Sequence, residues 1–99
     1  MILGKVIGTV WSTKKDENLI GAKFLIVQQL DLDLKPKDST VVAVDSVGAG
    51  VGEVVLYAQG SSARQTTQTK DKPIDAVIMA IVDKLDVSVK EKLKDMVAQ

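Results

Sequence analysis

The chain has 99 residues, enough for one domain, and 13 Lys and Arg residues balance 13 Asp and Glu residues to a net charge of zero. This balance disfavours a nucleic-acid binder, whose affinity depends on neutralising phosphates, and disfavours electrostatic attachment to a membrane. Histidine and cysteine are both absent, which excludes disulfides, thiolate metal sites and the commonest general base.

The first predicted strand covers residues 2–11, which are rich in β-branched residues. Gly4 and Gly8 interrupt it, and glycines inside a strand often mark bulges, bends or the close approach of another backbone. A strongly bent strand of a small barrel would use both. The charged residues 12–18 that follow are predicted to form an exposed loop.

A second strand is predicted within residues 19–34, which contain a fully apolar run from Phe24 to Val27. Its end alternates apolar and polar residues with period two, a pattern typical of a half-exposed strand, through Leu30, Leu32 and Leu34. Residues 35–39 are predicted to be a loop, with Pro36 as the residue that breaks the strand.

Two further strands, at residues 40–45 and 53–58, flank a glycine-rich segment that is predicted to be a structural turn joining them as a hairpin. The turn residues are Asp45, Gly48, Gly50 and Gly52. A phosphate-binding loop fits poorly, because the spacing is G-x-G-x-G and the following residues favour a strand. No helix N-terminus is then available to bind the anion.

A short polar stretch, Gly60, Ser61, Ser62, Ala63 and Arg64, follows the fourth strand. Two hydroxyls and one guanidinium within four residues could bind an anion. The favoured interpretation is structural: one serine caps a single helical turn, and the arginine pairs with a carboxylate. A nucleophilic serine is disfavoured because the chain has no histidine to activate it.

Residues 65–72 are polar and are predicted to form a mobile loop. The next apolar run, residues 76–82, could be a buried helix or a strand covered on both faces, and periodicity does not decide between them. If it is a strand, one face enters the core and a neighbouring subunit would most easily cover the other. This run is therefore a hint of oligomerisation.

Residues 88–99 are predicted to form an amphipathic helix. Ser88 and Glu91 fit a capping box, and apolar residues recur at helical spacing at Val89, Leu93, Met96 and Val97. So short a helix is marginal alone, so its apolar stripe should dock on its own barrel or on a neighbour. The expected organisation is a barrel domain at residues 1–87 and a helical extension at 88–99.

No catalytic residue, cofactor site or metal site is predicted. Four aspartates, at positions 45, 75, 83 and 86, lie beside apolar runs, where such residues more often end strands or accept backbone hydrogen bonds. The chain lacks the D-x-D-x-D-G pattern of a calcium loop. It also lacks an apolar run long enough to span a membrane and a signal peptide, so we expect a soluble cytoplasmic protein.

Several segments occur in an informative order. Residues 4–10 are G-K-V-I-G-T-V, residues 19–27 are L-I-G-A-K-F-L-I-V, residues 43–53 are A-V-D-S-V-G-A-G-V-G-E and residues 60–64 are G-S-S-A-R; P-I-D-A at 73–76 and I-V-D at 81–83 complete the set. Together they resemble the EutN/CcmL family of bacterial microcompartment vertex proteins. The blocks at 45–53 and 60–64 are the most specific, and the match ends near residue 87.

The resemblance implies a mainly β fold, a small five-stranded OB-like β-barrel, here with a short C-terminal α-helix. It also implies a non-enzymatic structural protein that forms homopentamers at the vertices of a polyhedral shell, beside hexameric shell proteins, with no nucleic acid or membrane as partner. It favours a strand at residues 77–82 and puts Gly60 to Arg64 near subunit contacts or a central pore. The alternative is a small OB-fold binding module for nucleic acid or a small ligand, which scarce aromatics disfavour.

Overall fold

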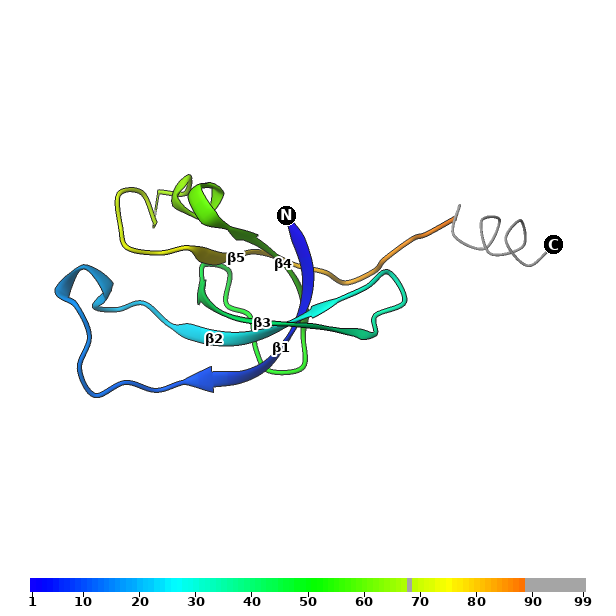
Figure 1. The fold of residues 1–99 in the computed structure, drawn as a ribbon, viewed down its shortest axis with the longest axis horizontal. Coiled ribbons are helices and arrows are strands. Elements are labelled where there is room, and N and C mark those ends of the chain that lie inside the picture. The colour runs from blue at the N-terminus through cyan, green and yellow to red at the C-terminus, as the bar shows by residue number, and fades with distance from the viewer. Residues whose placement is uncertain (68, 89–99) are drawn as a thin grey trace.

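The structure, a computed structural model, describes residues 1–67 and 69–88. Five strands form a closed barrel in the order β1-β2-β3-β5-β4. They are β1 (Ile2–Val10), β2 (Phe24–Leu30), β3 (Pro36–Asp45), β4 (Val54–Gln59) and β5 (Ala76–Ile81), joined with two short 3-10 helices, η1 (Glu17–Leu19) and η2 (Gly60–Arg64) (Figure 1). The predicted mainly β, five-stranded OB-like barrel is confirmed.

The strand order contradicts the predicted hairpin between the third and fourth strands. β3 pairs with β2 and, in parallel, with β5, whereas β4 pairs with β1 and β5. The glycine-rich segment therefore crosses between strands that are not neighbours. Closing the barrel requires this crossover, because β1 then pairs on both of its edges, with β2 and with β4.

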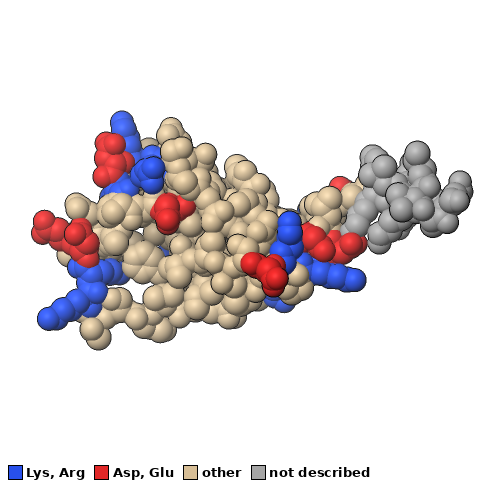
Figure 2. All heavy atoms as spheres, viewed as in Figure 1, with Lys and Arg blue, Asp and Glu red and all other residues tan. Residues whose placement is uncertain are grey.

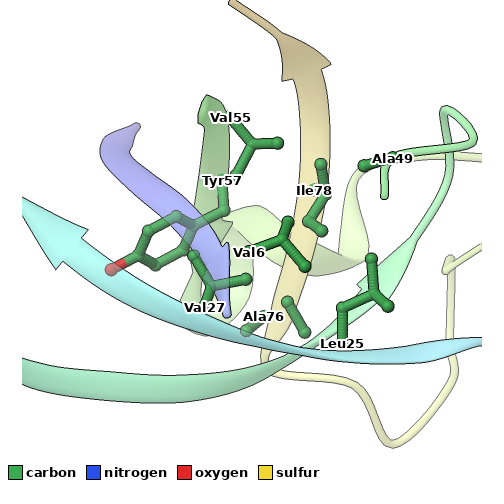
Figure 3. Packing of buried hydrophobic residues seen from close by; sticks show 9 residues of the cluster. Val6, Leu25, Val27, Ala49, Val55, Tyr57, Ala76 and Ile78 are labelled. Atoms are coloured by element: carbon green, nitrogen blue, oxygen red, sulfur yellow. The ribbon is translucent and has the colours of Figure 1, made fainter. Parts of the chain in front are cut away.

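The barrel core is built from inward-facing aliphatic side chains around one tyrosine (Figure 3). Its fully buried members are Val6, Leu25, Val27, Ala43, Ala49, Val55, Tyr57, Ala76 and Ile78. Gly4 lets β1 approach this core: a Cβ there would lie 2.5 Å from Val27 Cγ1 and 2.8 Å from Tyr57 Cε1. Gly8 follows a register shift in the pairing of β1 with β2, so both glycines act as the sequence predicts.

A second apolar cluster lies under η2. Its buried members are Val44, Ala58, Ala63, Ile74 and Val77. Val77 is 0% exposed within a single chain. The strand predicted at residues 77–82 is thus confirmed as β5, but no neighbouring subunit is needed to cover its second face where Val77 lies. The chain supplies that cover itself.

The segment between β2 and β3 differs from its prediction. The strand ends at Leu30, because Asp31 Oδ1 accepts hydrogen bonds from the backbone N–H groups of Asp33, at 2.7 Å, and Lys35, at 3.0 Å. This side-chain bonding offers the backbone a turn instead of a ladder. Pro36 does not break the sheet but begins β3, a position where proline is tolerated.

The chain leaves the barrel after β5. Val82 still donates its backbone N–H to Val54 O, at 2.8 Å, and residues 83–88 then run away from the barrel (Figure 1). The helix predicted from Val89 to Ala98 lies outside the described residues.

Candidate assembly surface

The segment between β3 and β4 is held by carboxylates from its own two ends. Asp45 Oδ1 accepts hydrogen bonds from the backbone N–H groups of Val47 and Ala49, each at 3.1 Å. Glu53 Oε1 accepts one from Gly50 N–H, at 2.7 Å. These are the amides that a bound anion would need, and two carboxylates already occupy them. These two carboxylates take up the amide donors and would repel an anion, so the segment disfavours anion binding.

Two of the three turn glycines have a conformation that favours glycine. Gly48 has φ +77° and Gly52 has φ +95°, whereas Gly50 lies outside this left-handed region. Gly52 N–H donates to Val6 O at 2.8 Å, which ties the segment to β1. Ala49 is 1% exposed and joins the barrel core. The segment thus closes the barrel as part of its interior.

The Gly60–Arg64 stretch forms the single helical turn that the sequence predicts, η2. Gly60 has φ +65° and donates its N–H to Asp75 O at 2.8 Å. Ala63 is buried beneath the turn, and Arg64 Nη1 donates to Ile74 O at 3.1 Å. Both ends of the turn are therefore fixed to the strand and loop below it.

Two details of η2 correct the prediction. The N-cap residue is Gln59, without a side-chain capping bond, so neither serine caps the turn. Within the described ranges, Arg64 bonds a backbone carbonyl and has no carboxylate partner. Ser61 and Ser62 are both exposed. The turn therefore presents two small hydroxyl side chains outward on a fixed backbone.

The polar loop after η2, predicted to be mobile, contains a hydrogen-bonded turn and one buried side chain. Thr69 is 0% exposed, and its backbone N–H donates to Thr66 Oγ1 at 3.0 Å. Lys70 N–H donates to Thr66 O at 2.9 Å. A buried threonine is thus bonded within its own turn to Thr66. No sequence signal distinguishes Thr69, because all three threonines of this loop look alike.

A polar hollow of about 990 Å³ separates this loop from the one between β1 and β2. Its lining combines residues of the two loops: Asp16, Asn18, Ser61, Arg64, Gln65, Lys70, Asp71, Lys72 and Pro73. OB folds use the corresponding loops to bind ligands. Here the lining charges are mixed in sign and, apart from half-buried Arg64, belong to exposed side chains, so the hollow is not an electrostatic site for an anion. Sequence reasoning identified only the Ser61 and Arg64 part of it.

On the face of the barrel that Figure 2 shows, most charged side chains gather at two ends. Figure 2 shows Lys, Arg, Asp and Glu clustered around the loops at one end and around the β2–β3 turn at the other, with little charge between. Outward-facing Ile7 is 49% exposed and Val42 is 51% exposed. Ile26 lies between their strands, because it pairs with Gly8 and with Val42. The partly apolar surface at Ile7, Ile26 and Val42 suits contact with another protein.

Among residues 1–67 and 69–88, no group of three or more metal-ligating side chains comes together. In the same part of the chain, no helix is long and apolar enough to cross a membrane. The two predicted residue sets remain apart: no hydrogen bond between described residues joins the glycine-rich segment to η2.

The fold defines a small OB-like barrel protein, and comparison places it in a family. Residues 1–83 match the model of a family described as "Ethanolamine utilisation protein EutN/carboxysome". The chain therefore belongs to the EutN/CcmL family, as its sequence segments indicate.

Several relatives are similar over nearly the whole barrel. The bacterial microcompartment shell vertex protein GrpN of Rhodospirillum rubrum is 54% identical over 86 residues, covering 87% of this chain and 97% of GrpN. The carboxysome shell vertex protein CcmL of Synechocystis is 48% identical over 88 residues, covering 89% and 88% of the two chains. The solved structure of the R. rubrum GrpN pentameric microcompartment shell protein gives a TM-score of 0.80 at 52% identity, covering 88% of this chain and 99% of that one.

Proposed function

We propose that this chain is a structural shell protein that forms cyclic homopentamers and caps the vertices of a polyhedral bacterial microcompartment in the cytoplasm. The observation that carries the proposal is the likeness to GrpN, a pentameric microcompartment shell protein, over the entire barrel. The relatives are structural shell proteins, and we extend the same non-enzymatic role to this chain.

The role is geometric. A closed polyhedral shell built from flat six-fold sheets needs five-fold corners, so the partners are hexameric shell proteins and other copies of this chain. A neutral chain also lacks the self-repulsion that keeps monomers apart. No step of this role requires a catalytic group.

We further propose that Gly60 to Arg64 lies at or near the contacts between subunits or the central pore. Two features support this. The turn is fixed from below by Ala63 and Arg64, and its serines are exposed without a structural task in the monomer. Because the backbone of η2 is already fixed, contacts made by its serines between subunits would cost little conformational entropy.

Shell assembly tests the vertex role. Hexameric shell proteins would be expressed with and without this chain, and the particles examined by electron microscopy. We expect closed polyhedra only when this chain is present, and open sheets or tubes without it. Closed particles in both preparations would contradict the vertex role.

The proposed contact is tested with one substitution and a control. Ser62→Arg places a long charged side chain on η2, whereas Asp38→Arg places the same side chain at an exposed position of β3. Native mass spectrometry should show fewer pentamers for Ser62→Arg and unchanged pentamers for Asp38→Arg. Intact pentamers in both variants would remove η2 from the interface.

A further inference from the structure

An apolar groove of about 510 Å³ lies at the end of the barrel where the chain leaves it. It is lined by side chains from five parts of the chain, among them Ile2, Leu3, Leu30, Leu32, Leu56 and Leu85. Leu32 is 57% exposed and Leu85 is 37% exposed. Met1, which also lines the groove, is 79% exposed, so the groove leaves apolar surface in water that a docked segment would remove.

The segment after β5 contributes one residue to the groove, and the residues that follow do not line it. Leu85 lines the groove, but Asp86 and Ser88 are exposed, and the segment runs past the β2–β3 turn and away from the barrel (Figure 1). Docking of later residues on the same barrel would require the chain to reverse at once. The direction of residues 83–88 instead carries the chain away from its own barrel.

The eleven residues that follow have a composition that matches the groove. Positions 89, 93, 96 and 97 are Val, Leu, Met and Val, which recur at the spacing of one helical face. Lys90 and Lys92 would flank that face on its two sides. At the rim of the groove Asp31 contributes a carboxylate whose Oδ1 already bonds two backbone N–H groups. Lys37 lines the groove as well, so the match between the tail and the groove is apolar and not electrostatic.

We propose that residues 89–99 of one copy dock through this apolar stripe into the groove at Leu32 and Leu56 of a neighbouring copy, as a strap between subunits. The proposal rests on the proposed pentamer. It concerns a segment that lies beyond the family match at residues 1–83, so the strap would be a feature added to the shared barrel.

Cysteine cross-linking tests the strap directly, because the natural chain has no cysteine. The double variant L32C/L93C would be oxidised as the full chain and separated under denaturing, non-reducing conditions. We expect a ladder of covalent dimers and larger species that collapses on reduction, since a disulfide needs Cα atoms about 4.4–6.8 Å apart. The matched control is L34C/L93C: Leu34 is exposed in the same turn but does not line the groove, so this variant should remain monomeric on the gel.

Each outcome decides the question. A monomer with an internal disulfide overturns the strap, because the tail then docks on its own barrel. A native pentamer without any disulfide also overturns the strap but leaves the proposed pentamer intact. A native monomer overturns both.

A second measurement checks the energetics. Deletion of residues 89–99 and Leu32→Asp should each lower the melting temperature of the assembly by several degrees, and their combination should lower it no further, because both remove one contact. Additive losses would contradict docking of the tail at Leu32.

Discussion

The glycine-rich segment between β3 and β4 and the η2 turn look alike in sequence but differ in where their polar groups are used. In the first, Asp45 and Glu53 bond the segment's own amides, and Ala49 enters the core. In the second, Gly60 and Arg64 bond backbone carbonyls and Ala63 is buried, whereas both serine side chains are exposed. A segment whose polar groups are satisfied internally supports the fold, whereas one that leaves them outside is available to a partner.

The largest loss of stability is expected from substitution of Asp45, which holds the glycine-rich segment. Replacing Asp45 with Ala leaves two backbone N–H groups, including that of buried Ala49, without an acceptor. We expect a loss of about 1–3 kcal/mol in the free energy of unfolding, measured by urea denaturation. Asp45→Asn keeps an acceptor oxygen and should lose clearly less; equal losses would mean that these hydrogen bonds do not hold the segment.

The turn glycines give the next effect. Gly52→Ala forces a side chain into φ +95° and should cost about 1–2 kcal/mol of unfolding free energy. Gly50→Ala is the control, because Gly50 has no positive φ and its Cβ would be 3.4 Å from Glu53 Oε1, an ordinary contact. Equal melting temperatures for the two variants would contradict the assigned backbone conformation.

Tyr57 lies in the core, outside both the glycine-rich segment and η2, so its substitution provides a reference for the stability changes expected in those two regions. Tyr57 is 0% exposed, and its hydroxyl has no hydrogen-bond partner among the described residues and points away from the rest of the cluster (Figure 3). Tyr57→Phe should therefore leave stability unchanged or raise it by up to about 1 kcal/mol at neutral pH. A clear loss would reveal a partner for the hydroxyl.

The same variant has a pH signature. Burial raises the pKa of Tyr57 above its usual value of about 10. Above that pH the unfolded chain releases the phenol proton before the folded chain does, so stability present below about pH 10 is lost as pH rises toward the folded pKa. Denaturation at pH 9 to 11 should show a smaller decline for Tyr57→Phe than for the natural chain.

The smallest effect on stability is expected on η2. Ser61→Arg changes an exposed side chain with no role in the monomer fold, so unfolding of the dissociated chain should shift by no more than about 0.5 kcal/mol. The pentamer should nevertheless weaken, as for Ser62→Arg. A large loss of monomer stability would show that Ser61 supports the fold, and would contradict the proposed difference between η2 and the glycine-rich segment.

Sequence reasoning identified the barrel and its strands but not their pairing. Patterns at residues 40–45 and 53–58 indicate strands, yet which strands adjoin depends on closing a barrel through contacts distant in sequence. The alternation of Leu30, Leu32 and Leu34 misled because one side chain, Asp31, turns the backbone there. Pro36 misled because it begins a strand, where its missing N–H does little harm.

The candidate surface was predictable only in part. The turn at Gly60 to Arg64 follows from the sequence, but the carbonyl that Arg64 bonds belongs to Ile74, ten residues further on. The groove at Leu32 and Leu56 could not be foreseen, because its lining residues come from separate strands and turns. Its exposed leucines were assigned to a strand instead.

The native mass of the full chain at micromolar concentration tests the proposed function most directly. A cyclic pentamer requires a dominant species of five times the mass of one chain, which dissociates to single chains on unfolding. A dominant monomer under the same conditions would contradict the vertex role, whatever the similarity of the barrel to its relatives.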